Sequence, residues 1–109
     1  MARVLIFEPD LNVRQLLELQ VEHLGHEAVR GDSPFDIALI EPAVAEGFAF
    51  ARALRDRFPD LPLVFVSVRY PAGDTAALRP HAHLVKPFGL RVLGSALAGA
   101  EEMLASSRR

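Results

Sequence analysis

The sequence has no cysteine, no strong excess of charge of one sign and no long hydrophobic run, and each absence excludes a class of protein. Without cysteine there are no disulfides, thiolate metal sites or cysteine nucleophiles. The 12 basic and 14 acidic residues give a net charge of −2, whereas nucleic-acid binders usually carry a basic face. No apolar run approaches membrane-spanning length, and Met1-Ala2-Arg3 leads straight into an expected strand. We therefore expect a cytoplasmic protein that binds neither nucleic acid nor membrane.

The length and composition indicate one soluble globular domain. A chain of 109 residues, of which 50% are hydrophobic and 24% charged, can form a single core but not two. We find no repeat, no low-complexity segment and no internal linker. The prediction is one domain over residues 1–105, with residues 106–109 as a frayed tail or the start of a linker.

Four short apolar runs, each ending at a polar or ionisable residue, organise the chain. The central run, Ile37–Ile40, stops at Glu41; the others, over residues 4–7, 63–66 and 83–85, stop at Glu8, Ser67 and Lys86. Uninterrupted apolar runs of this length are typical of strands buried on both faces of a parallel sheet. The carboxyl ends of such strands share one edge, where ligands bind. We therefore expect Glu8, Glu41, Ser67 and Lys86 to meet in one crevice.

Helices are expected between most of these strands. Asp10 is placed to cap a helix that ends at Gly25. Further helices are predicted from Gly47 to Phe58, over residues 75–78 and from Leu90 to Leu104. Their expected core-facing side chains are Val13, Leu16, Leu17, Val21 and Leu24 in the first, Phe50, Ala51, Leu54 and Phe58 in the second, and Leu90, Leu93, Leu97 and Leu104 in the last.

One connection lacks a helix. Residues 31–35 lead from a short second strand, Glu27–Val29, directly into the central strand, although a parallel crossover normally needs a dozen or more residues. We predict that an extended strap makes this crossing, since the seven residues between Val29 and Ile37, at about 3.4 Å each, just span the sheet. The expected architecture is α/β, a five-stranded parallel sheet with helices on both faces.

With these residues placed, the whole chain resembles a response-regulator receiver domain, the phosphorylatable module of two-component signalling. The matching motifs are the acidic segment Phe7-Glu8-Pro9-Asp10, then Glu41, Ser67, and finally Lys86-Pro87-Phe88, each at a strand end and in this order. The resemblance implies a flavodoxin-like (CheY-like) doubly wound sheet with strand order 2-1-3-4-5. It also implies a cis peptide bond before Pro87.

The resemblance assigns a role to each site residue. Glu41 occupies the position of the phosphoacceptor aspartate, and Glu8 and Asp10 match the acidic cluster that holds a magnesium ion. Ser67 and Lys86 match the residues that contact the phosphoryl oxygens. His83 matches the aromatic switch position whose rotamer reports phosphorylation; the alternative is a half-exposed histidine on an edge strand.

The chain departs from the family pattern at four points. Glu41 is one methylene longer than aspartate, and a displacement of about 1 Å can cost on the order of 10²-fold in rate. Pro9 replaces the second acidic residue, which weakens a magnesium site. Val68 stands where a small residue is usual, and the family's second helix is missing while its fourth is shortened. These departures favour a pseudo-receiver that does not undergo aspartyl phosphorylation, rather than an enzyme.

Several interpretations stay open for these residues. Glu41 could pair with Lys86, mimic a phosphorylated state, or act as a residual phosphoacceptor; we favour pairing with Lys86. A weak divalent-metal site at Glu8, Asp10 and Glu41 is a minor alternative to no cofactor. Ser67 lacks the flanking motif of a hydrolase nucleophile. His81 and His83 alternate along a strand but have no third metal ligand.

The predicted function is signal transduction through phosphorylation-independent contact with protein partners of a signalling pathway. In receivers the working surface, often used for homodimerisation, is formed by the fourth helix, fifth strand and fifth helix. These map to residues 75–78, 83–85 and 90–104. The alternatives are a magnesium-dependent phosphorylatable receiver and a module of the same fold that binds a small anionic ligand. An acidic crevice without a glycine-rich phosphate loop disfavours the latter.

Overall fold

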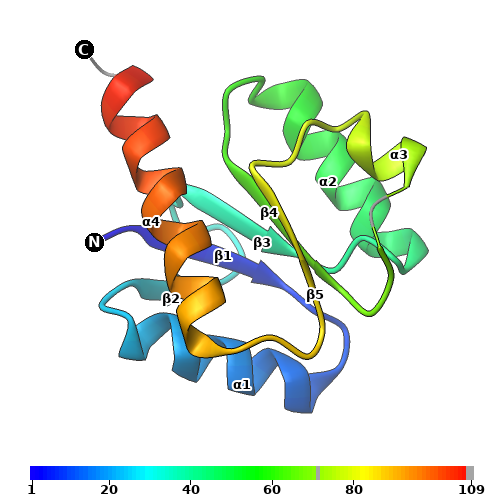
Figure 1. Ribbon diagram of the computed structural model, residues 1–109. Coiled ribbons are helices and arrows are strands. Elements are labelled where there is room, and N and C mark those ends of the chain that lie inside the picture. The colour runs from blue at the N-terminus through cyan, green and yellow to red at the C-terminus, as the bar shows by residue number, and fades with distance from the viewer. Residues whose placement is uncertain (71, 108–109) are drawn as a thin grey trace.

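The computed structural model describes residues 1–70 and 72–107 and has five parallel strands in the order β2-β1-β3-β4-β5 (Figure 1). The strands are β1 (Arg3–Phe7), β2 (Glu27–Val29), β3 (Ile37–Ile40), β4 (Leu63–Ser67) and β5 (Ala82–Val85). The helices are α1 (Leu11–His23), α2 (Ala45–Arg57), α3 (Gly73–Ala76) and α4 (Leu90–Ser107). The strand positions and the order 2-1-3-4-5 are confirmed. Within the described ranges, no helix is both apolar enough and long enough to span a bilayer.

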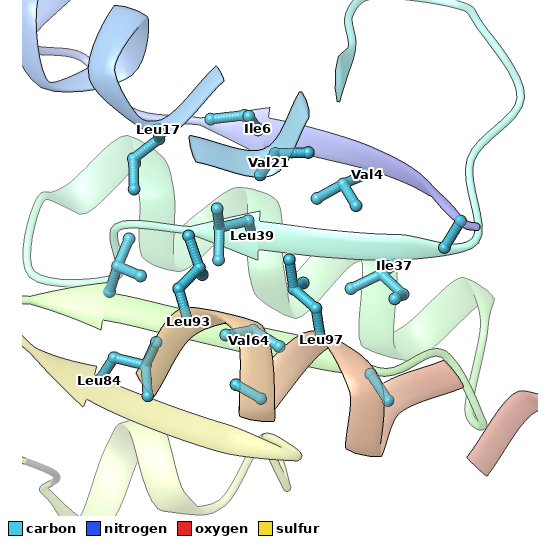
Figure 2. Packing of buried hydrophobic residues seen from close by; sticks show 14 residues of the cluster. Val4, Ile6, Leu17, Val21, Ile37, Leu39, Val64, Leu84, Leu93 and Leu97 are labelled. Atoms are coloured by element: carbon cyan, nitrogen blue, oxygen red, sulfur yellow. The ribbon is translucent and has the colours of Figure 1, made fainter. Parts of the chain in front are cut away.

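A hydrophobic core lies on each face of the sheet. Helices α1 and α4 cover one face, where Leu17 and Val21 of α1 and Leu93 and Leu97 of α4 point toward the strands (Figure 2). Helix α2 covers the other face, and its Ala51 and Leu54 pack in a second cluster with Phe65. All four residues of β3 are completely buried, as expected for a strand at the middle of a doubly covered sheet.

Local sequence signals explain where α1 begins and ends. Asp10 Oδ1 accepts hydrogen bonds from the backbone N–H groups of Asn12 (2.9 Å) and Val13 (3.2 Å), which satisfies two of the free donors of the first turn. After the last turn, Gly25 adopts a φ of +88°, a conformation that favours glycine. The predicted cap and stop are therefore both confirmed.

Two predicted core positions are wrong. Leu16 is 55% exposed, because Leu16 and Leu17 are adjacent on α1 and only one of them can face the sheet. Phe58 is 39% exposed, because it lies just beyond the end of α2, where the chain leaves the sheet face. Leu90 is only half-buried, whereas the small residues Ala96 and Ala100 complete the buried side of α4.

Helix boundaries also differ from the predictions. Helix α2 begins two residues before Gly47, and the short helix α3 lies at Gly73–Ala76 rather than at residues 75–78. Helix α4 continues to Ser107, so Ser106 and Ser107 are helical rather than frayed. The remaining two residues of the predicted tail, 108–109, lie outside the described part of the chain.

The strap between β2 and β3 is confirmed. Residues 30–36 contain no helix, and they cross from the edge strand β2 past β1 to β3. Asp36 anchors the end of the strap to β1: its N–H donates to the Arg3 carbonyl (2.8 Å) and its carboxylate accepts from the Arg3 N–H (2.9 Å). The Arg3 guanidinium also pairs with this carboxylate, at 3.1 Å. The family's second helix is therefore missing, as the sequence predicted.

Candidate functional site

The carboxyl ends of β1, β3, β4 and β5 bring Glu8, Glu41, Ser67 and Lys86 together. The Lys86 ammonium donates a short hydrogen bond to Glu8 Oε1 and lies 3.7 Å from Glu41 Oε2. Ser67 Oγ donates to Glu41 Oε1 at 3.3 Å and accepts from the Arg69 N–H at 3.1 Å. Lys86 is the one lysine of the sequence, so a single ammonium group links both glutamates.

This cluster is largely closed to solvent. Glu8 and Glu41 are each 6% exposed and Ser67 is 1% exposed, whereas the side chain of Lys86 retains 19% exposure. A carboxylate removed from water needs a cation or several donors. Here Lys86 serves two carboxylates, so negative charge exceeds positive charge within the cluster.

The pKa of Glu41 is raised above its ordinary value. Burial is the largest cause, because it disfavours the charged carboxylate, and the nearby Glu8 acts in the same direction. Lys86 and the Ser67 hydroxyl oppose the shift without cancelling it. Within the described part of the chain, Glu41 Oε2 is a buried oxygen with no hydrogen-bond donor, and its nearest cation is the ammonium of Lys86.

Gly47 positions α2 against the peptide that carries Glu41. A β-carbon at residue 47 would lie 1.8 Å from the Glu41 carbonyl oxygen, so only glycine permits this approach of the helix to the end of β3. The sequence marks Gly47 only as a predicted helix start, and this contact was not predicted.

Asp10 does not join the cluster. Its carboxylate caps α1, and its N–H donates to Glu8 Oε2 at 3.3 Å. Among residues 1–70 and 72–107, no three histidine, aspartate or glutamate side chains lie close enough together to hold a metal ion. Glu8, Asp10 and Glu41 therefore do not form a metal-binding group in this structure.

The other predicted positions surround the cluster. The Lys86–Pro87 peptide bond is cis, as predicted. His83 is half-buried: its Nε2 lies 3.1 Å from the Arg69 carbonyl oxygen, and its ring meets Phe65 edge to face at 5.9 Å. His81 instead lies against Gly99 of α4. Val68, which follows Ser67, is 68% exposed.

Arg55 of α2 is buried, which was not predicted from the sequence. Its guanidinium donates to four backbone carbonyls, those of Leu78 (2.8 Å), Phe58 (3.3 Å), Pro59 (2.8 Å) and Arg79 (3.1 Å). Burial and the nearby Arg79 lower its pKa. Nothing in the helical pattern marks this position, since an arginine in the charged run Arg55-Asp56-Arg57 usually faces solvent.

No family model matches the sequence, and no curated protein sequence matches it. Solved structures do share its fold. A sensor protein from Polaromonas sp. JS666 is 23% identical with a TM-score of 0.75, and the match covers 93% of this chain and 97% of that one. The chemotaxis protein CheY4 of Vibrio cholerae is 21% identical with a TM-score of 0.79, over 90% and 97% of the two chains.

A third similar structure is the receiver domain of the sensor histidine kinase PA1611 from Pseudomonas aeruginosa PAO1. It is 17% identical with a TM-score of 0.76, over 88% of this chain and 93% of that one. That structure has a magnesium ion coordinated in the active-site cleft. The topology and these likenesses together show that the chain has the fold of the CheY-like receiver domains of two-component response regulators.

Proposed function

We propose that this domain is a pseudo-receiver, which transmits signals through protein contacts without aspartyl phosphorylation. The observation that carries the proposal is the position of the Lys86 ammonium, which contacts Glu8 and lies near Glu41. In this arrangement the Lys86 ammonium, rather than a bound metal ion, offsets part of the negative charge of the two glutamates.

The arrangement of Glu41 also disfavours phosphoryl transfer. That reaction depends almost entirely on positioning and on neutralisation of charge. Ser67, which matches the hydroxyl that would contact a phosphoryl oxygen, instead donates to Glu41 Oε1. The raised pKa of Glu41 further lowers the fraction of the nucleophilic carboxylate at a given pH.

The residues present do not fit a magnesium ion. Magnesium requires near-octahedral oxygen ligands. Pro9 offers no side-chain oxygen, Asp10 Oδ1 is engaged at the start of α1, and Lys86 lies beside the two remaining carboxylates. We therefore assign no cofactor, and no step of the proposed function uses one.

The partner surface in this proposal is formed by α3, β5 and α4, and it binds a protein of the signalling pathway or a second copy of the chain in the cytoplasm. Val92 and Met103 of α4 are 47% and 41% exposed, which gives the helix apolar contact area. Because α3 has only four residues, α4 and β5 would supply most of the contact.

Beryllofluoride with Mg²⁺, followed by amide NMR, tests the proposal. We expect no significant shifts at residues 41, 67 and 86 in the natural protein, because the cluster has no place for either ion. Large saturable shifts at these residues would show a phosphorylatable receiver. The double variant Glu41→Asp/Pro9→Asp is the positive control: recovery of the response there, but with neither single variant, would show that both positions contribute to the loss.

A further inference from the structure

A groove lies at the end of the sheet opposite the charged cluster. Strap residues 31–36, the second half of α2 and the α2–β4 link at residues 59–61 line this strap groove, whose volume is about 820 Å³. The strap precedes β3 and the link precedes β4, so the groove lies at the amino-terminal ends of the strands. It shares no residue with the cluster of Glu8, Glu41, Ser67 and Lys86.

The walls of the strap groove are mainly apolar and aromatic. The lining side chains that define them are Leu5, Phe35, Phe50, Leu54, Phe58 and Leu61. The rings of Phe35 and Phe58 meet edge to face at 6.2 Å, and Phe50 stacks on Phe7 at 5.1 Å. Phe58 retains 39% exposure, which is a large area of aromatic surface to leave in water.

The groove follows from the missing helix. A parallel crossover usually places a helix on the sheet, but the strap crosses from β2 to β3 as a single extended segment. An extended segment covers less of the sheet than a helix does. Two turns of a helix about 10 Å wide occupy roughly 850 Å³, close to the volume of the groove.

Charges at the edges indicate the polar flanks of an occupant. Asp32 of the strap and Asp60 of the α2–β4 link are both exposed. Arg57 lies over the Phe58 ring at 5.2 Å, and Asp36 holds Arg3. A small-ligand site would need polar groups directed at its floor. Asp32 and Asp60 instead lie exposed at the edges, and the carboxylate of Asp36 is engaged by Arg3. This distribution favours the apolar face of an amphipathic helix.

We propose that the strap groove binds an amphipathic helix of a partner protein, with an apolar stripe against Phe35, Phe58 and Leu61 and with lysine or arginine toward Asp32 and Asp60. The partner helix takes the place on the sheet that a crossover helix would otherwise occupy. This binding is independent of the chemistry at Glu41.

Two synthetic peptides test the proposal. Both are 18-residue amphipathic helices with leucine at positions i, i+3, i+4 and i+7; one carries lysine on its flanks, the other glutamate at the same positions. We expect the lysine peptide to bind at least tenfold tighter in fluorescence anisotropy and to shift the methyl signals of Leu5, Leu54 and Leu61. The double variant Asp32→Asn/Asp60→Asn should remove most of this preference.

Substitutions in the strap groove provide a second test of peptide binding. Ser33→Trp places a large side chain in the groove from an exposed position and should weaken lysine-peptide binding at least tenfold. Phe58→Ser should do the same, whereas Tyr70→Ser, at an aromatic residue that is 80% exposed outside the groove, should not. Equal binding of both peptides, or shifts away from these methyl groups, would overturn the proposal. Indole or naphthalene binding in the groove without peptide binding would identify a small-ligand pocket instead.

Discussion

Lys86 is the residue on which the charge balance of the cluster depends. It is the single ammonium group linking Glu8 and Glu41, and both glutamates are buried. Removing one partner of a buried ion pair is strongly destabilising, because the remaining charge loses its compensation. The cost should therefore depend on whether the two carboxyl groups are ionised.

Lys86→Met should lower the free energy of unfolding by about 3 kcal/mol at neutral pH, the lower end for a broken buried pair. Urea unfolding at pH 7 and pH 4 measures the loss, which should shrink at the lower pH as the Glu41 carboxyl group becomes protonated. Arg91→Met, at an exposed cation of α4, is the matched control and should change stability by no more than about 0.5 kcal/mol. Equal losses in the two variants would contradict the assigned role of Lys86.

The contribution of Glu41 to the stability of the protein should change with pH in the direction opposite to that of most carboxyl groups. Its pKa is raised in the folded protein, so the folded state holds a proton more tightly than the unfolded state. Stability contributed by Glu41 is then lost as pH rises through the window between its unfolded and folded pKa values, because ionisation in the burial site is unfavourable. The window lies above the ordinary carboxyl pKa of about 4.3.

Glu41→Gln removes this ionisation while keeping the shape of the side chain. We expect the free energy of unfolding of the variant, relative to the natural protein, to increase as pH rises from about 4 to 7. Urea unfolding at four pH values gives the difference directly. A difference that stays constant, or that decreases with pH, would show that Lys86 outweighs burial at Glu41.

For single residues, the positions of side chains at the strand ends could be predicted from the sequence, but the contacts between these side chains could not. Glu8, Glu41, Ser67 and Lys86 could be placed together because each directly follows an apolar run. The contact of Gly47 with the Glu41 carbonyl could not, since it depends on the angle at which α2 leaves the sheet. The displacement of Asp10 from the cluster follows from its capping bonds, which compete with any other role.

Among the elements, α2 and the segment after α3 are joined by Arg55. Its four carbonyl partners include Leu78 and Arg79, more than twenty residues away in sequence. Arg79 has a φ of +54°, uncommon for a residue with a β-carbon, and the guanidinium holds its carbonyl in this turn. Sequence patterns along one helix cannot reveal such a bond, because the acceptors are backbone atoms of another segment.

Arg55→Met should cost about 1–3 kcal/mol of stability, because buried carbonyls lose their donor while the aliphatic packing is kept. Amide hydrogen exchange should accelerate at residues 78–81 more than in the strands. Arg52→Met, an exposed position on the same helix, is the control and should leave both measurements unchanged. Unchanged exchange at residues 78–81 in Arg55→Met would show that the turn holds without the guanidinium.

Helix ends and exposed faces were the least predictable features of the elements. The adjacent pair Leu16-Leu17 fits the apolar stripe of α1 in two ways, and only packing against the sheet decides that Leu17 is buried. The prediction ended the last helix at Leu104, whereas α4 continues for another three residues to Ser107. Serine is a neutral helix former, so its presence does not mark an end.

For the whole molecule, the central strands couple two cores. Leu39 belongs to the cluster under α1 and α4, and Phe65 belongs to the cluster under α2. Their strands, β3 and β4, are neighbours, so neither core can open without disturbing the other. Small single domains of this kind usually unfold in one cooperative step.

We expect Leu39→Ala to cost about 2–5 kcal/mol and Phe65→Ala about 3–5 kcal/mol. In each variant, the methyl signals of Leu97 on one face and Leu54 on the other should disappear at the same urea concentration. Two distinct midpoints in either variant would show that the faces unfold separately. The natural protein provides the reference, with a single midpoint for both reporters.

The overall architecture was the most predictable level. Uninterrupted apolar runs and the intervening helical patterns indicate a parallel sheet covered on both faces, but they do not order its strands. The order 2-1-3-4-5 came from resemblance to receivers and is confirmed by the structure. The strap groove was not predicted. A missing helix can be recognised in a sequence, but the space that it leaves depends on how the neighbouring segments pack.

The absence of a β-carbon at residue 47 has a mechanical consequence. Helix α2 rests directly on the peptide of Glu41, and the far end of the same helix supplies Phe58 to the opposite end of the sheet. Helix α2, of 13 residues, spans the sheet between these two contacts. A β-carbon at residue 47 would force α2 or the Glu41 peptide to shift, and α2 also carries Phe50 and Leu54 of the strap groove.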